Sequence, residues 1–174
     1  WSAFHRFDPM EVIATAAETR ELLDKHPGRP YLLFPEDRMR PIRMTGDLPL
    51  CWIRRGPGEE FRGSARPGEF YVFQIGVLAA RGAIEDLKAE ISELKSPDGK
   101  TIAAEGFHAF NLGGTDWLGR PFTKPFAVAQ GKVGVLWFGV QVPKDAAGSY
   151  QGTITLHPRH AEPRTGSARV SRPR

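Results

Sequence analysis

The feature that most constrains the fold is a long apolar run followed by a strand of alternating polarity. Residues 133–142 are rich in β-branched and aromatic side chains, a composition typical of a strand buried on both faces. Pro and Gly in residues 143–148 supply the chemistry of a turn. Tyr150, Ile154 and Leu156 then alternate with polar residues, which indicates one face on a core and one in water. The segment predicts an antiparallel β-arch or hairpin, and hence an all-β fold.

A second strand buried on both sides is predicted at residues 69–80. Its odd- and even-numbered positions are both mostly apolar, so it is the natural neighbour of residues 133–142. If these two strands form the core, truncating Trp137 or Phe73 to alanine should cost about 3–5 kcal/mol of stability.

Shorter segments complete the prediction. We expect strands at residues 11–14, 31–34, 41–44, 48–53, 61–65 and 107–112. One short helix is predicted near the N-terminus, because Thr15 and Glu18 have the spacing of a capping box and the helical pattern continues to about His26.

Residues 84–94 fit both a helical and a strand period. The turn sequence at residues 96–99, followed by the apolar residues 101–104, favours a β-hairpin.

Length and composition limit the classes of protein to consider. With 174 residues the chain is one domain by length, and it is too short for a (β/α)8 barrel of at least about 200 residues. The single Cys51 excludes an internal disulfide framework. Apolar stretches stay shorter than the roughly 18 residues that span a membrane, so no membrane partner is expected.

The net charge of +4 is confined to the C-terminal end. Residues 159–174 hold five arginines and one glutamate, whereas residues 1–158 hold 19 basic and 19 acidic side chains. A neutral body lacks the basic face of a nucleic-acid-binding protein, so no nucleic acid is expected. The sequence thus divides into a domain at residues 1–158 and a basic tail at 159–174. We interpret the tail as a truncated strand or a linker toward a missing catalytic domain.

The residue types that carry catalysis are not arranged for it. The paired carboxylates at residues 36–37, 59–60 and 85–86 are sequence neighbours, which point to opposite faces of an extended chain and do not converge. The five histidines lack metal-ligand spacing. Cys51 lies in an apolar segment, predicted as a strand, and is better explained as a small buried residue than as a nucleophile. We therefore expect no catalytic residue, no metal site and no cofactor.

A long Gly-rich loop at residues 113–124 contains all the candidate binding residues except Trp52. Trp117, Trp52 and Phe122 could each stack on the apolar face of a sugar ring. Asp116 would place a hydroxyl acceptor beside Trp117. The alternative is that Trp117 packs under its own loop as a plug.

Four segments resemble a known family. Residues 31–44 (YLLFPEDRMRPIRM), 68–80 (GEFYVFQIGVLAA), 110–126 (FNLGGTDWLGRPFTKPF) and 135–156 (VLWFGVQVPKDAAGSYQGTITL) are similar to the N-terminal domain of glycoside hydrolase family 123 and related bacterial proteins. The likeness covers about residues 1–158. The ending VPKDAAGSYQGT also resembles immunoglobulin-like sandwiches attached to bacterial enzymes.

The resemblance implies a β-sandwich preceding a (β/α)8 barrel that hydrolyses β-linked N-acetylgalactosamine with an adjacent Asp-Glu pair. This chain contains no Asp-Glu dipeptide, so no catalytic residue carries over. The predicted fold is a mainly antiparallel β-sandwich, immunoglobulin-like or galactose-binding-like, with one short N-terminal helix. The predicted function is that of a non-catalytic accessory domain, whose partner is the catalytic (β/α)8 domain of the same polypeptide.

Two other functions stay open at this point. One is a stand-alone carbohydrate-binding module that uses Trp117, Asp116 and, more weakly, Trp52 to bind a glycan. The other is a protein-binding surface or adhesion module. The sequence leaves the localisation open, with the bacterial periplasm or exterior as the expectation that the resemblance carries.

Overall fold

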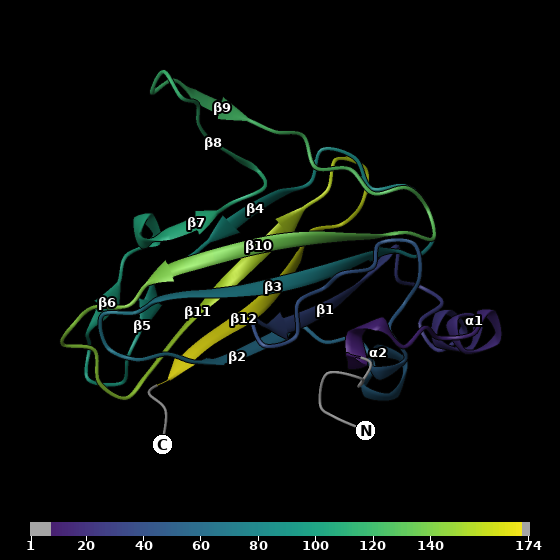
Figure 1. Cartoon of the computed structure of the whole chain (residues 1–174), viewed down its shortest axis with the longest axis horizontal. Helices are drawn as coiled ribbons and strands as arrows, with labels where there is room; N and C mark the ends of the chain where they lie inside the picture. Colours follow the sequence, from purple (N-terminus) through teal and green to yellow (C-terminus); the bar gives the residue numbers. More distant parts are fainter. Residues whose placement is uncertain (1–7, 172–174) are drawn as a thin grey trace.

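Strand β3 lies at the centre of a four-stranded sheet because both of its faces are apolar. The computed structural model of the chain describes residues 8–171. The sheet is antiparallel throughout, and its strands are, in spatial order, β1 (Tyr31–Asp37), β3 (Phe70–Ala79), β10 (Val133–Gln141) and β7 (Phe107–Ala109) (Figure 1). Ile75 lies opposite Leu136, so the predicted pairing of the two apolar strands is confirmed.

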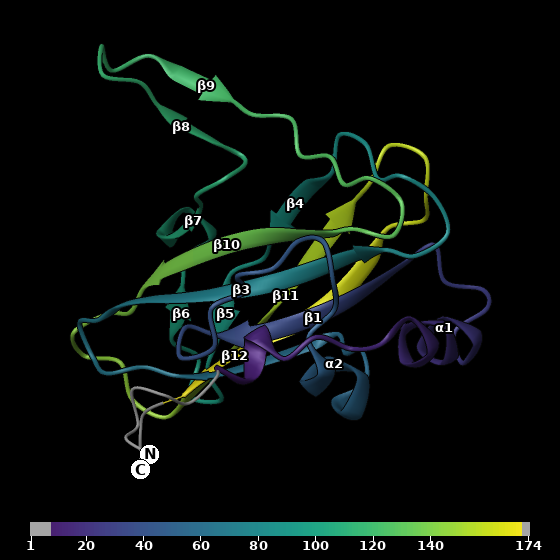
Figure 2. The ribbon, with the colours of Figure 1, turned by 45° about the vertical axis from the view of Figure 1, so that its right-hand side comes forward.

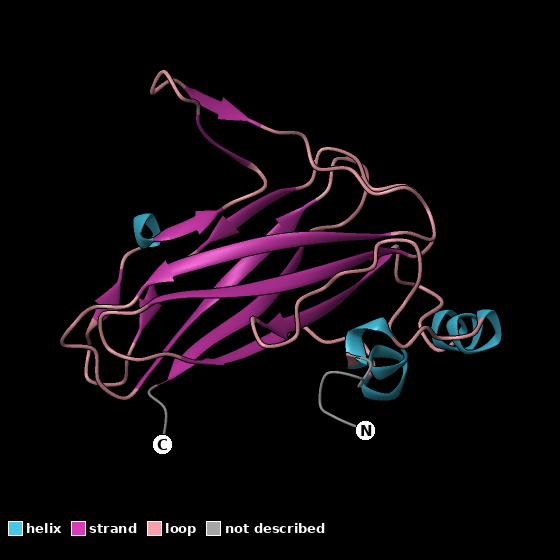
Figure 3. Ribbon diagram, viewed as in Figure 1, coloured by secondary structure: helices cyan, strands magenta, loops and turns pink. Residues whose placement is uncertain are grey.

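A second sheet packs against the first, and Figure 3 shows how strands dominate the molecule. Its spatial order is β2 (Glu60–Ser64), β12 (Arg164–Ser171), β11 (Ser149–His157), β5 (Leu94–Lys95) and β6 (Thr101–Ile102), with β4 (Lys88–Ile91) also on β11. Only the β2–β12 pairing is parallel. The predicted mainly antiparallel β-sandwich is confirmed. Because β10 and β11 belong to different sheets, residues 133–156 form the arch and not the hairpin.

Within residues 8–171, few elements lie outside the two sheets. They are the helices α1 (Ala16–Asp24) and α2 (Leu50–Arg55), single 3-10 turns at Pro9–Glu11 and Ala104–Gly106, and a separate hairpin of β8 (Gly113–Thr115) and β9 (Pro121–Thr123). The capping box that predicted α1 is present, with the Glu18 N–H donating to the Thr15 hydroxyl and the Thr15 N–H to the Glu18 carboxylate. No helix in the described part of the chain is long and apolar enough to cross a membrane.

The main core lies between the sheets and is built on stacked aromatic rings. Phe73 of β3 stacks on Phe61 of β2 at 4.2 Å between ring centroids and on Phe138 of β10 at 5.4 Å. Ile154 and Leu156 enter the same core from β11. These contacts join the two sheets, because Phe61 belongs to one and Phe73 to the other.

A second core covers part of the outer face of the first sheet. The far end of the Trp52 indole lies against β3 at Gly76, where any Cβ would clash with it, and the indole stacks on Phe34 at 4.4 Å with an interplanar angle of 2°. The indole N–H of Trp52 donates to the buried Glu36 carboxylate at 2.7 Å, and Arg55 binds the same oxygen at 2.7 Å. Figure 2 shows α1 and α2 gathered on the side of the sheet where β1 lies.

Several predicted elements differ from the structure. The strand predicted at residues 48–53 is wrong, because this segment is mostly the helix α2, which begins after Pro49 and ends at Gly56 with φ of 79°. Arg54 and Arg55 in its last turn suit the negative end of a helix. Residues 11–14 and 41–44 also form no named strand; Ile13 makes only a single bridge to Pro49.

Residues 84–94, which fit both a helical and a strand period, contain the strand β4 and the start of β5, as the turn at residues 96–99 indicated. β5 and β6 pair across that turn, and β4 lies beside β11. At the C-terminus, β12 sits between β2 and β11, so the second sheet continues past the predicted domain boundary at residue 158. Within the predicted tail, Arg164–Ser171 is the strand β12, and residues 172–174 lie outside the described residues.

The core assignments predict unequal effects of two aromatic truncations. Phe73 is fully buried between the sheets, so Phe73→Ala should cost about 3–5 kcal/mol. Trp137 is only half-buried on the outer face, so Trp137→Ala should cost less than the value expected for a core residue. Denaturant unfolding of both variants measures the difference. Equal losses would contradict this division of the core.

The Glu36 carboxylate should stabilise the docking of α2. Glu36→Ala leaves the buried indole N–H of Trp52 without its acceptor, and the expected loss is about 1–3 kcal/mol. Glu21→Ala is the matched control, since Glu21 forms an exposed ion pair with Lys25 and its loss should cost at most about 0.5 kcal/mol. Chemical denaturation compares the two, and similar losses would show that Glu36 stabilises no more than a surface charge does.

Candidate binding surface beside strand β7

Part of the outer face of the first sheet is left open by the helices and carries exposed aromatic rings. Phe70 of β3, His108 of β7 and Phe110 just after β7 form a group that we call the aromatic patch. Their ring centroids lie 5.8 to 6.5 Å apart. Phe70 is 39% exposed and Phe110 49% exposed. Gly139 of β10 lets the rings of both phenylalanines lie close to the sheet, because a Cβ there would clash with them.

The hairpin β8–β9 projects from the body next to this patch (Figures 1 and 2). Its two strands pair only with each other, over three residue pairs. Asn111 fixes its base: the backbone N–H of Trp137 donates to the Asn111 side-chain oxygen at 3.0 Å, and the Asn111 amide donates to the carbonyl of Val135. The side chain of Asn111 thus occupies the free edge of β10 as a neighbouring strand would.

The tip of the hairpin is held in one conformation by Asp116. Its Oδ1 accepts from the backbone N–H groups of Leu118 and Arg120, both at 2.9 Å, and its Oδ2 accepts from Arg120 Nε at 2.9 Å. Gly119 has φ of 78° and its N–H donates to the Asp116 carbonyl, which is a turn followed by a left-handed residue. The bonds from Arg120 and Leu118 keep the pKa of Asp116 below its usual value.

The rigid tip presents apolar side chains to solvent. Trp117 is 89% exposed, and Leu118 and Phe122 are each about half exposed. The alternative in which Trp117 packs under its own loop therefore does not hold in this structure. Asp116 is beside Trp117 as predicted, but both of its oxygens are already engaged within the turn. The tip therefore offers an exposed aromatic surface, and three of the roughly four acceptor sites of the neighbouring carboxylate are already used within the turn.

Trp52 lies apart from the exposed tip and has no exposed surface. Phe34 stacks on its ring, the end of the ring lies against the sheet at Gly76, and the whole residue is buried, so a sugar has no access to it. Cys51 is half-buried, and burial together with the charge of Glu36 raises the pKa of its thiol, as expected for an unreactive side chain. Within residues 8–171, His, Cys, Asp and Glu form no group that could hold a metal ion.

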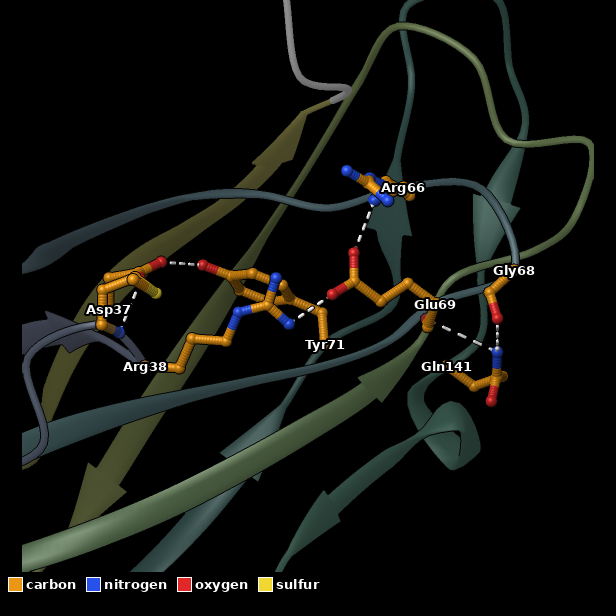
Figure 4. A network of polar contacts seen from close by, with 8 residues as sticks. Asp37, Arg38, Arg66, Gly68, Glu69, Tyr71 and Gln141 are labelled. Carbon is orange, nitrogen blue, oxygen red and sulfur yellow. Dashed lines mark hydrogen bonds and ion pairs between the residues drawn. The ribbon is translucent and has the colours of Figure 1, made fainter.

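A polar network joins the end of β1 to the start of β3, and Figure 4 shows its members. The Tyr71 hydroxyl donates to Asp37, and Arg38 pairs with Glu69 while lying over the Tyr71 ring at 4.8 Å. Glu69 also accepts from the backbone N–H of Arg66 at 2.7 Å. The carboxylates of Asp37 and Glu69 both bind groups of the network itself, so we interpret the network as structural, stabilising the start of β3.

The comparisons with known proteins give a likeness of fold. No family model matches the chain, and no curated protein matches it. Among solved structures, a family 123 glycoside hydrolase from Clostridium perfringens is similar with a TM-score of 0.55 and 15% identity, over 69% of this chain and 24% of the hydrolase. The chain therefore matches about a quarter of that enzyme's length, and the resemblance is a distant structural one.

Two other solved structures have lower scores. The ASH/PapD-like domain of human CEP192 is 11% identical, with a TM-score of 0.44 over 67% of this chain and 82% of that domain. The self-complemented MyfA, the major subunit of Myf fimbriae from Yersinia enterocolitica, is 13% identical, with a TM-score of 0.40 over 68% of this chain and 94% of the subunit.

Trp117 could be singled out from the sequence as an aromatic residue in a Gly-rich loop, whereas the aromatic patch could not. Phe70 and Phe110 are 40 residues apart in the sequence, and their contact depends on the β3–β10–β7 order and on Gly139. The Asp-x-x-Gly spacing of Asp116 and Gly119 was the available signal for an ordered tip within the loop.

The buried tyrosines predict a loss of stability in alkali. Burial raises the pKa of Tyr31 to about 12, and burial and the bond to Asp37 raise the pKa of Tyr71 further. Above about pH 10 the unfolded chain loses these protons while the folded chain keeps them, so stability should fall as the pH rises toward 12. In Tyr71→Phe the fall, followed by denaturant unfolding at successive pH values, should be shallower. An unchanged slope would contradict the assignment to Tyr71.

Proposed function

We infer that the chain is a non-catalytic accessory domain of a carbohydrate-active enzyme, with a glycoside hydrolase acting on N-acetylgalactosaminides as the expected parent. In this proposal it packs against a separate catalytic (β/α)8 domain of the same polypeptide. The observation that carries the proposal is the ordered hairpin tip with Trp117 89% exposed. An exposed tryptophan in a pre-formed turn has the character of an interface anchor.

The isolation of the hairpin supports a packing partner. A two-stranded hairpin alone is marginally stable in water, and β8–β9 pairs with no third strand in the described part of the chain. Its apolar side chains would gain burial against another surface. The hydrolase likeness supports the same proposal, because the matched region is a minor part of a longer enzyme chain.

Docking through the hairpin predicts a specific loss of binding on truncation. With the catalytic domain expressed separately, Trp117→Ala should weaken association by about 30-fold, the effect of one hot-spot residue of about 2 kcal/mol. Titration calorimetry measures the affinity. Unfolding should show unchanged stability, since Trp117 has few contacts to lose.

Met39→Ala is the matched control for this experiment. Met39 is 79% exposed after β1, away from the hairpin in sequence, so its truncation removes a similar exposed apolar group and should leave the affinity unchanged. An equal effect of both variants, or none for Trp117→Ala, would contradict docking through the hairpin. A coding sequence without a (β/α)8 domain would contradict the accessory role itself.

A second candidate function is that of a carbohydrate-binding module, and the exposure of Trp117 favours it. The indole could stack on a sugar ring without any change in the fold. The three bonds that Asp116 already makes count against it, because they leave little of the carboxylate for a sugar hydroxyl, and stacking alone gives little selectivity. Saturable binding to a glycan array carrying terminal N-acetylgalactosamine, abolished by Trp117→Ala, would favour this function over docking. Association with an unrelated protein would favour an adhesion module.

A further inference from the structure

A separate pocket gathers positive charge between the end of α1 and the start of β12. It has a volume of about 240 Å³ and is lined by polar side chains from three segments of the chain. His26 and Arg29 come from the turn after α1, Glu59 from the residue before β2, and Arg164 from the first position of β12. Leu32, Leu33, Pro57 and Gly58 complete the lining. The backbone holds the turn in place, since the N–H of Arg29 donates to the His26 carbonyl at 3.2 Å.

Two guanidinium groups share one carboxylate in this pocket. Arg164 and Arg29 both approach the same oxygen of Glu59, Arg164 in direct contact and Arg29 at 3.9 Å, which is too far for a hydrogen bond. The Arg29 side chain is about half exposed, so its donors are free to meet a ligand from solvent. The two arginines and the one glutamate therefore give the lining one more positive charge than negative charge.

Arg164 is the fixed element of the pocket. Its side chain is 12% exposed, and its Nη1 donates to the Tyr31 carbonyl at 3.0 Å. Its Nε is buried without a hydrogen-bond partner in the described part of the chain. Burial, reinforced by the charge of Arg29, lowers the pKa of Arg164. The two cations thus repel one another across a carboxylate that compensates only one of them.

We propose that this pocket binds a small oxyanion, with the sulfate ester or the carboxylate of an acidic sugar as the class of ligand. Such a group supplies the missing negative charge, and a planar guanidinium binds oxyanions through two parallel N–H donors. The pocket has room for one charged group with its attached ring edge and not for an oligosaccharide buried whole. The oxyanion site does not depend on the hairpin, whereas the choice of a sugar as the carrier of the oxyanion rests on the proposed function.

The test begins with inorganic sulfate as the probe, titrated into the chain at constant ionic strength and followed by NMR. Saturable shifts are expected at the signals of His26, Arg29 and Arg164. Arg29→Gln should weaken binding by about tenfold or more, the effect of one charge-assisted contact. Glu59→Gln should tighten it several-fold, because it removes the carboxylate that competes for both arginines.

Arg20→Gln is the matched control, as it makes the same charge change at an exposed position on α1. Shifts that do not saturate, or an equal loss in Arg20→Gln and Arg29→Gln, would overturn the proposal in favour of a diffuse ion atmosphere. If Glu59→Gln does not fold, the comparison of Arg29→Gln with Arg20→Gln decides alone. Titrations with a sulfated monosaccharide, a uronic acid and a neutral sugar then identify the source of the oxyanion. Equal binding of the neutral sugar would overturn the proposal.

Discussion

The burial of both faces of β3 is the constraint on which the rest of the structure depends. One face stacks Phe73 against the second sheet, and the other receives Trp52 at Gly76, where the absence of a side chain lets the indole lie on the backbone. A strand with two apolar faces needs a cover on each. The second sheet is the first cover. The second cover is assembled from the N-terminal segment and α2, and Glu36 holds it in place through the indole N–H of Trp52 and the guanidinium of Arg55.

The second cover is shorter than the sheet, and this difference creates the candidate surface. Leu78 near one end of β3 is buried under the N-terminal segments, whereas Phe70 at the other end is 39% exposed. The strand β7, with His108 and Phe110, extends this open part of the sheet and leads directly into the hairpin. The exposed aromatic rings and the projecting tip therefore occur together because one edge of the sandwich is both uncovered and continuous with the loop after β7.

The elements that could be predicted are those that a pattern of neighbouring residues specifies. Continuous apolar runs predicted β3 and β10, alternation predicted β11, and Thr15 with Glu18 predicted α1. The six-residue helix α2 was not predicted, because a short apolar run carries no period to separate helix from strand. The aromatic patch was also beyond the sequence, since it requires the order of strands. Trp117 could be singled out by its Gly-rich loop, but its exposure follows from the bonds that Asp116 makes within the turn.

The bonds of Asp116 also distinguish an interface anchor from a mobile loop. A flexible loop that orders on binding loses conformational entropy at that moment, which weakens the complex. Here Asp116 and the left-handed Gly119 already fix the turn, so the tip loses little on association. The same bonds use three of the roughly four acceptor sites of the carboxylate, so little of it is left for a sugar hydroxyl. A tip that is ordered and mostly apolar, with little free polar capacity, is suited to an apolar protein surface more than to a glycan, and this favours docking as the role of the hairpin.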